Sequence, residues 1–312
     1  MNIQPEPKNF RIRTTLLLAE LRAPFLTATL ASVILGTAMA WSVANRFDTI
    51  LFILTLVGTS CLHAGANVIN DYFDYRSGCD QANRDAIPPF TGGSGLLVQG
   101  ALSPKEVLAY ALGLFTLGGS IGFYLAMVRG WFVLVLVIFG ILSGYFYTTH
   151  LATRGIGELF VGLNFGPLLA LGTYYVQTQA LSIEPFIAAL SLGLLVTAIL
   201  WINEIPDHNA DSHVGKNTAV VRLGKKRAAD IYAFIVGTAY LTLVIGVATH
   251  ILPITSLLAL LTLYPAVKAM KIASQHYDSK ELRPANALTI QVHFTMGILL
   301  TIAYILSRFL HF

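Results

Sequence analysis

The chain has 312 residues, and only 12% of them are charged, about half the roughly 25% that is typical of a soluble globular domain. With 55% hydrophobic residues and a positive mean hydropathy, the composition excludes a water-soluble enzyme and predicts an all-α, multi-pass membrane protein. Its two cysteines, Cys61 and Cys79, cannot build a disulfide framework or a thiolate zinc site. The net charge is +4, but the basic residues are distributed as in a membrane protein of fixed orientation, so we expect no nucleic-acid partner.

The membrane spans are predicted from uncharged runs of about 20 residues, the length that a helix needs to cross about 30 Å of hydrocarbon. A longer run from Ile231 to Val267 is interrupted by His250 and Pro253, which predicts two helices joined by a tight turn, the second continuing past Lys268. Seven further runs follow the length criterion: 23–44, 49–70, 107–128, 131–149, 159–183, 185–203 and 284–307. We therefore expect nine transmembrane helices in one bundle, forming a single domain over residues 1–312.

The positions of the basic residues predict the orientation of these helices. If the N-terminus is cytoplasmic, 17 of the 20 Lys and Arg residues lie on the cytoplasmic side, and only Arg46, Arg129 and Arg308 lie on the other. This asymmetry is typical of membrane proteins with a cytoplasmic N-terminus, and nine spans place the C-terminus outside. We expect a plasma (inner) membrane protein in which the polar residues 1–19 form a cytoplasmic segment that is not a removable signal peptide.

Two long cytoplasmic loops are expected, at residues 71–106 and 204–229, whereas the connections on the opposite side are only a few residues long. We therefore expect the active-site cavity on the cytoplasmic side. Within the first loop, Pro88–Gly95 is rich in glycine but lacks the Gly-Lys-Ser/Thr ending of a P-loop and follows no strand. We interpret residues 88–100 as a lid.

An acidic run ends the second predicted span. Asn67, Asp71 and Asp74 stand at i, i+4 and i+7, so one helix face carries an amide and two carboxylates, with Asn70 close to that face. A second run ends the sixth span, where the corresponding residues Asn203, Asp207 and Asp211 stand at i, i+4 and i+8. Either run alone is compatible with a capped helix end whose acids are solvated.

Two matching runs favour a cation site. Clustered carboxylates at a membrane edge repel one another and are costly to bury, and a divalent cation removes that cost. Ligands that are all oxygens suit Mg²⁺, which is often held by one or two carboxylates together with substrate phosphates. The runs start 136 residues apart, which is compatible with an internal repeat of four helices.

Basic residues near the acidic runs are candidates for binding phosphate oxygens. Lys216 and Arg222 follow the second run, Arg22 opens the first span and Arg154 precedes the fifth. The alternative is that these are ordinary cytoplasmic charges. His63 and His293 lie inside spans and are interpreted as hydrogen-bonded packing residues.

At this point the two runs, placed at the ends of the second and sixth of nine helices, resemble those of the UbiA-type membrane prenyltransferases over residues 20–230. The third acid of the first run is at Asp80, while position 78 is glycine, and this is similar to the 1,4-dihydroxy-2-naphthoate prenyltransferase branch. Other segments similar to that branch are Thr91–Gly100, Gly155–Leu159 and Gly215–Gly224. The second run departs from the family, since it reads Asn203-Glu-Ile-Pro-Asp207 where an Asn-x-Arg-Asp pattern is common.

The resemblance implies transfer of a polyprenyl group from its diphosphate to an aromatic acceptor, in menaquinone biosynthesis if the acceptor is dihydroxynaphthoate. Asp71, Asp74, Asp207 and Asp211 are then expected to hold Mg²⁺, with the other candidates contacting substrate: Asn67, Asn70, Asp80, Asn203, Lys216, Arg222, Arg22 and Arg154. Hydrophobic helix faces that open sideways to membrane lipid are expected to admit the prenyl tail. Two alternatives stay open: a relative that acts on another acceptor (4-hydroxybenzoate, homogentisate, a lipid alcohol or a tetrapyrrole), and a cation-coupled transporter.

Overall fold

The computed structural model describes residues 10–310, which contain only helices and their connections. The α-helices are α1 (Phe10–Glu20), α2 (Ala23–Ala44), α3 (Thr49–Ser77), α4 (Cys79–Ala82), α5 (Pro104–Arg129), α6 (Trp131–Phe146), α7 (Gly157–Leu163), α8 (Leu169–Thr178), α9 (Ile183–His213), α10 (Ala219–Leu223), α11 (Lys225–Ala248), α12 (Leu263–His276) and α13 (Arg283–Leu310). Short π-helical or 3₁₀ segments extend several of them: η1 (Tyr147–Leu151), η2 (Ala152–Arg154), η3 (Asn164–Leu168), η4 (Ile254–Thr262) and η5 (Lys280–Leu282).

Nine helical stretches of the described chain are long and apolar enough to cross a membrane, which confirms the predicted fold class. The tight turn after α11 is also present. His250 adopts a left-handed backbone conformation with φ of 58°, and the N–H groups of Ile251 and Leu252 both donate to the carbonyl of Gly246. The next span runs from Ile254 to His276 and therefore continues past Lys268, as expected.

The predicted lengths of the two long loops were wrong. Helix α3 continues to Ser77 and α9 continues to His213, so both acidic runs lie on helices that extend beyond the apolar part of the span. Polar residues at those ends keep their backbone hydrogen bonds by continuing the helix. Residues 10–20 of the expected N-terminal segment form α1, whereas Lys8 and the rest of residues 1–9 lie outside the described residues.

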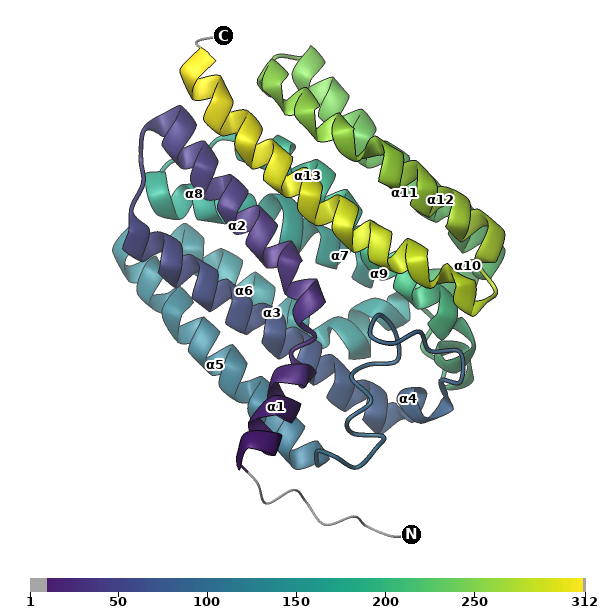
Figure 1. Ribbon diagram of the computed structural model, residues 1–312. Coiled ribbons are helices and arrows are strands. Elements are labelled where there is room, and N and C mark those ends of the chain that lie inside the picture. The colour runs from purple at the N-terminus through teal and green to yellow at the C-terminus, as the bar shows by residue number, and fades with distance from the viewer. Residues whose placement is uncertain (1–9, 311–312) are drawn as a thin grey trace.

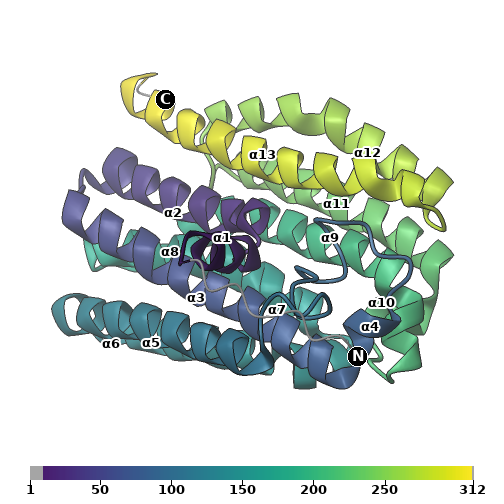
Figure 2. The same ribbon diagram turned by 60° about the horizontal axis from the view of Figure 1, so that its bottom comes forward.

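The bundle has two distinct ends (Figure 1). One end carries α1, α4, α10 and the segment between α4 and α5, and we call it the α1 end. The last turns of α13 lie at the opposite end, as nine crossings require. Figure 2 shows the α4–α5 segment lying across the α1 end, where Asn83 and Asp85 are hydrogen-bonded to α9.

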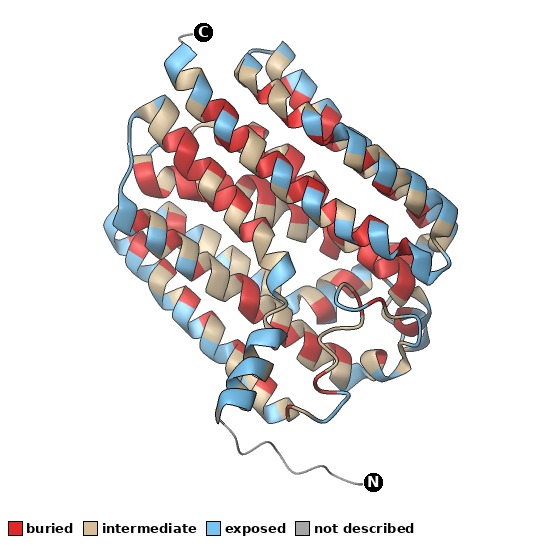
Figure 3. Ribbon diagram, viewed as in Figure 1, coloured by how far each residue is buried: buried red, intermediate tan, exposed pale blue. Residues whose placement is uncertain are grey.

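Helix α9 is at the centre of the packing. It contacts α2, α7, α8, α11 and α13, and most of its length is buried (Figure 3). The main buried cluster joins it to α2, α8, α11, α12 and α13 through side chains such as Leu35, Leu192, Ile202, Tyr232 and Met296. By contrast, α5 and α6 expose large apolar side chains such as Phe123 and Ile138, as expected of surfaces that face lipid.

Small residues allow the α7–η3 segment to lie directly against α9. A Cβ atom added at Gly166 would be 2.3 Å from the Cα atom of Gly193, and one added at Gly193 would be 2.6 Å from the carbonyl oxygen of Gly162. Membrane helices use such glycines to bring their backbones close together. This close contact holds the wall of the cavity described below.

We predict that substitution by alanine changes the stability of the protein differently at two glycines. Gly166→Ala should lower the apparent Tm of the purified protein, because overpacking a tight contact costs about 1–3 kcal/mol. Gly237→Ala is the matched control, since Gly237 lies on the exposed side of α11 with no atom within 4 Å of an added Cβ, and it should be neutral or stabilising by up to about 1 kcal/mol. Equal Tm values for the two variants would contradict this account of the α7–α9 contact.

Candidate active site

A cavity of about 280 Å³ runs through the bundle between α3, α5, α6, α8 and α9. Its wall is polar at the α1 end, where both acidic runs contribute side chains. It is mainly apolar over the remaining depth, where it includes Leu125, Val133, Leu136 and Val176. These last residues lie near the far ends of their helices. The cavity therefore connects a charged site at the α1 end with an apolar channel that reaches across most of the bundle.

The first acidic run lines one side of the polar end. Asn67, Asn70 and Asp74 are on the cavity wall, whereas Asp71 of the same predicted face is not. The amide nitrogen of Asn70 donates to Asp74 Oδ2 at 3.0 Å and to Thr148 Oγ1 at 2.8 Å, and that of Asn67 donates to the carbonyl of Leu21 at 3.1 Å.

Asp71 is held differently from the other acids. Its side chain is 2% exposed and does not line the cavity. Its Oδ2 accepts a hydrogen bond from the backbone N–H of Ser94 at 2.7 Å, and its Oδ1 lies 3.6 Å from the guanidinium of Arg22 and accepts no hydrogen bond. The α4–α5 segment thus covers this carboxylate.

The second run lines the opposite side, with Asn203, Asp207 and Asp211 all on the cavity wall. Asn83, from the α4–α5 segment, donates to Asp207 Oδ1 at 2.6 Å, and the thiol of Cys79 donates to Asp211 Oδ1 at 3.0 Å. The chain between α3 and α5 therefore contacts both of these acids, and through Ser94 it also contacts Asp71 of the first run.

Lys216 connects the two runs. Its ammonium lies 2.9 Å from Asp74 Oδ1 on α3 and 3.4 Å from Asp211 Oδ1 on α9. Burial lowers the pKa of Lys216, but the two carboxylates outweigh burial and hold the pKa well above its usual value. The lysine stays charged and compensates two acids that would otherwise repel each other.

The donor set of the polar end suits Mg²⁺. The four acids supply carboxylate oxygens and Asn67 and Asn70 supply amide oxygens, which are the ligands that Mg²⁺ prefers. The buried Oδ1 of Asp71 has no hydrogen-bond partner. Within residues 10–310, no three His, Cys, Asp or Glu side chains converge as a ready-made metal cluster, since Lys216 lies between Asp74 and Asp211. The residues fit a cation that enters together with an anionic ligand.

The remaining predicted site residues divide into two groups. Arg22 lines the cavity and donates to the carbonyl of Phe90 at 3.1 Å, and Asp80 also lines it. The structure does not bring Arg154 or Arg222 to the cavity. Both donate to backbone carbonyls at the exposed surface, Arg154 to that of His150 and Arg222 to those of Asn217 and Thr153. The bond from Arg222 to Thr153 connects two segments that are far apart in the sequence.

The segment interpreted as a lid lies over the polar end. Phe90, Gly92 and Gly93 are on the cavity wall. Ser94 is held from two sides, because its N–H donates to Asp71 and its hydroxyl donates to Glu20 Oε2 at 2.5 Å. Burial and the nearby charge of Asp71 raise the pKa of Glu20 to about 7.

Several cavity residues were not predicted from the sequence. Tyr147 donates to Glu204 Oε1 at 3.2 Å, and both line the cavity; Glu158 lies beside Glu204 and accepts a hydrogen bond from the N–H of Ala219. Glu204 and Glu158 stand inside motifs that were noted for other residues, and a buried acid in a membrane helix is a signal that could have singled them out. Asn83 and Ser94 carry no such signal.

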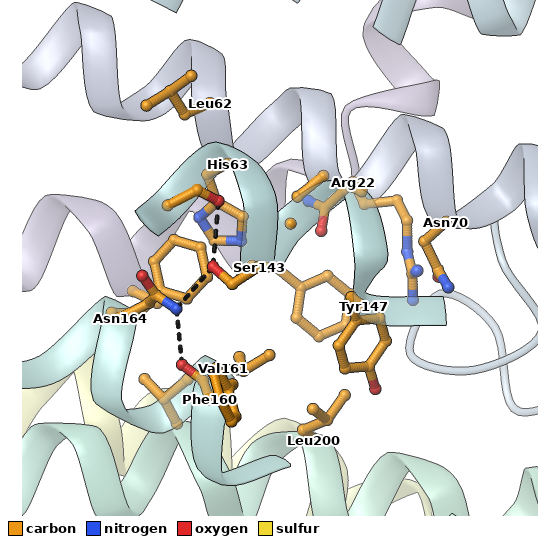
Figure 4. Close-up of a pocket in the computed structure, with 18 of the residues that line it drawn as sticks. Arg22, Leu62, His63, Asn70, Ser143, Tyr147, Phe160, Val161, Asn164 and Leu200 are labelled. Carbon is orange, nitrogen blue, oxygen red and sulfur yellow. Dashed lines mark hydrogen bonds between the residues drawn. The ribbon is translucent and has the colours of Figure 1, made fainter. Parts of the chain in front are cut away.

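A second polar group lies deeper in the cavity. Nδ1 of His63 is 2.8 Å from Oγ1 of Thr29, and its ring lies 4.0 Å from that of Phe165, as the interpretation of a hydrogen-bonded packing residue requires. Figure 4 shows His63, Ser143 and Asn164 on one side of the pocket, Arg22 and Asn70 on the other, and Tyr147 between them. His293 departs from the prediction, because it is fully buried and neither ring nitrogen has a hydrogen-bond partner among the described residues.

Comparison with known proteins gives consistent matches. The UbiA prenyltransferase family profile matches residues 29–304. The 1,4-dihydroxy-2-naphthoate octaprenyltransferase of Escherichia coli is 30% identical, covering 95% of this chain and 97% of its own length. The 2-carboxy-1,4-naphthoquinone phytyltransferase of Synechocystis is 28% identical over 92% of each chain. A UbiA homologue from Archaeoglobus fulgidus, solved with GPP and Mg²⁺, has a TM-score of 0.62, 16% identity, and coverage of 92% of this chain and 99% of that one.

The raised pKa of Asp80 predicts a pH dependence of stability. Burial, reinforced by the charge of Asp74, raises this pKa to about 8, whereas the unfolded chain has a value near 4. The folded protein therefore binds a proton that the unfolded chain releases, so this contribution to stability falls as pH rises from about 4 through 8. In metal-free buffer the apparent Tm should fall between pH 6 and pH 9, and in Asp80→Asn it should fall less.

Asp278→Asn is the matched control for that measurement. Asp278 is exposed, and its hydrogen bond and ion pair with Lys225 lower its pKa, so it stays ionised in both states above pH 6. Its pH profile should follow that of the wild type. A profile of Asp80→Asn as steep as that of the wild type would show that Asp80 does not bind the proton.

Proposed function

The chain belongs to the UbiA prenyltransferase family, and on this premise we propose that it transfers a polyprenyl group from its diphosphate to an aromatic acceptor, 1,4-dihydroxy-2-naphthoate. The observation that carries the proposal is the cavity that joins two facing acidic runs and Lys216 to a long apolar channel. Such a cavity suits a substrate with an anionic head and a hydrocarbon tail. The naphthoate acceptor is the one named for the Escherichia coli relative.

The polar end is the proposed site of the diphosphate. Asp71, Asp74, Asp207 and Asp211 would hold Mg²⁺, and a UbiA homologue of the same fold that was solved with GPP and Mg²⁺ supports a metal in such a site. Bound there, the metal supplies Lewis-acid stabilisation of the leaving diphosphate. Lys216 and Arg22 add positive charge near the same oxygens, and Asn67, Asn70, Asp80 and Asn203 complete the polar wall.

The apolar channel is the proposed site of the prenyl tail. Gly140 lies on its wall, and no atom is within 4 Å of a Cβ added there. It is seven residues before Tyr147 on the same span, or about 10 Å along the helix axis. If the diphosphate lies at the polar end near Tyr147, a tail of one isoprene unit ends before it reaches Gly140, whereas a tail of several units must pass Gly140.

The reaction follows from this arrangement. The bond between C1 of the prenyl group and the diphosphate oxygen breaks, and its electron pair leaves with the diphosphate, whose charge Lys216 and Arg22 offset. The electron-rich ring then supplies the pair for the new C–C bond at C1. With dihydroxynaphthoate, the bond from the ring to its carboxylate breaks next, carbon dioxide leaves, and that electron pair restores the aromatic ring.

Two further parts of the proposal concern location and the transporter alternative. The distribution of basic residues supports a plasma (inner) membrane location with the α1 end cytoplasmic. Both acidic runs lie at the α1 end, and the connections at the other end, such as Asn45–Asp48 and Gly130, are short. A transporter of the alternating-access type holds its coupling ions near the midplane between two gates, so this geometry favours the enzyme.

Turnover in a reconstituted membrane tests the proposed reaction. Protein in nanodiscs with Mg²⁺ and geranylgeranyl diphosphate should release diphosphate and form a prenylated, decarboxylated naphthoquinol with dihydroxynaphthoate, as detected by mass spectrometry. Lys216→Met and Asp207→Ala should each lower kcat by about 10²-fold or more. Lys225→Met, which breaks the pair with the exposed Asp278 outside the cavity, should retain wild-type turnover.

The other outcomes of this experiment are informative. Release of diphosphate with a different prenylated product would keep the reaction class and replace the acceptor. No release with several prenyl donors and aromatic acceptors, from protein with a normal Tm, would reject the enzymatic proposal and favour transport.

Filling the channel should select against long donors. We expect Gly140→Trp to lower kcat/KM for geranylgeranyl diphosphate by more than about tenfold, and to change kcat/KM for dimethylallyl diphosphate little. Gly113→Trp is the control, because Gly113 is exposed on α5, does not line the cavity, and also has open space at Cβ. An equal loss for short and long donors in Gly140→Trp would place the tail elsewhere.

A further inference from the structure

Asn203 of the second acidic run is bonded to a residue from the last span. The amide nitrogen of Asn286, on α13, donates to Oδ1 of Asn203 at 2.7 Å. Asn286 is fully buried and does not line the cavity, whereas Asn203 does. The two residues are 83 positions apart in the sequence.

The chemistry of the neighbouring groups fixes which way both amides point. The Asn286 nitrogen also donates to the backbone carbonyl of Ile202, at 3.4 Å, and a carbonyl oxygen can only accept a hydrogen bond. The NH₂ group of Asn286 must therefore face α9, and it meets the oxygen of the Asn203 side chain. The NH₂ group of Asn203 is then the group left to face the cavity.

The first run has the opposite arrangement. Asn67 and Asn70 use their NH₂ groups on acceptors, the carbonyl of Leu21 and the carboxylate of Asp74, so each turns its oxygen to the remaining space. The two runs share the Asn-x-x-x-Asp pattern but offer different groups. The first run presents amide oxygens, which attract cations, and the second presents an amide N–H, which attracts anions.

We propose that Asn286 is a positioning residue, which holds Asn203 with its NH₂ group in the cavity so that this group donates a hydrogen bond to an oxygen of the substrate diphosphate. The inference rests on the proposed function, because the anion at the polar end is taken to be the diphosphate. Without Asn286, the Asn203 amide is free to turn, and its oxygen would then meet the phosphate oxygens as a second acceptor.

A purely structural role is the competing explanation. Hydrogen bonds between amides on neighbouring membrane helices also stabilise helix packing, and α9 and α13 pack against each other. That role predicts a loss of stability without a specific loss of diphosphate binding. A measurement of affinity that includes Asn203 variants separates the two roles.

The experiment measures the Kd of a geranylgeranyl thiodiphosphate, with a sulfur in place of the bridging oxygen at C1, in nanodiscs with Mg²⁺ by calorimetry. Asn286→Leu and Asn203→Leu should each weaken binding about 10- to 150-fold, the range for one hydrogen bond to a charged group. The double variant should bind no more weakly than Asn203→Leu alone, because Asn286 acts through Asn203.

Thr289→Val is the matched control. Thr289 is one turn from Asn286 on α13, is 1% exposed, and shares a hydrogen bond with Tyr232 at 2.7 Å, so the substitution removes a buried interhelical bond that does not involve Asn203. Its Tm should fall as that of Asn286→Leu does, while its Kd stays within about twofold of the wild type.

Three results would overturn the inference. An unchanged Kd in Asn286→Leu, or an equal loss when Asn286→Leu is added to Asn203→Leu, would show that Asn286 does not act through Asn203. A wild type that binds no prenyl thiodiphosphate would remove both the inference and the proposed function. If the wild type binds the thiodiphosphate but prenylates no acceptor, the proposed reaction fails, and the Kd values still decide the role of Asn286.

Discussion

The cost of placing carboxylates in a membrane bundle shapes this molecule. Asp74 and Asp211 come from helices that are far apart in the sequence, and both are largely buried at one end of the cavity. A shared ammonium, from Lys216, compensates them. Without that charge the two carboxylates would repel each other. The ion bridge therefore holds α3 and α9 at the spacing that defines the polar end of the cavity.

The need to compensate buried carboxylates also explains why the α4–α5 segment lies over the polar end of the cavity. Its backbone and side chains supply donors to the acids that Lys216 does not reach, Ser94 to Asp71 and Asn83 to Asp207. Each run thus has one acid paired with the lysine and one acid paired with this segment. Since these partners are hydrogen-bond donors without a full charge, they are the contacts that a divalent cation can most readily replace.

The sequence alone was sufficient to predict features that depend on a local pattern of residues. The spans follow from apolar length, and the acidic faces follow from spacing along one helix. Of the four acids on those faces, Asp74, Asp207 and Asp211 line the cavity, and Asp71 does not. Proximity in sequence was a poor guide to the basic residues: Lys216 enters the site, but Arg222, six residues later, binds backbone carbonyls at the surface. Asn286 could not be predicted at all, because its role depends on how α13 packs on α9.

The depth of the cavity also bears on what happens after synthesis. Its polar end lies at the level of the α1 end, and its apolar wall reaches Val133 and Val176 near the far ends of their helices. The proposed product, held with its ring at the polar end and its chain along the apolar wall, would have the order of head and tail of a lipid in one leaflet. In that orientation it would join the leaflet without inverting its head and tail.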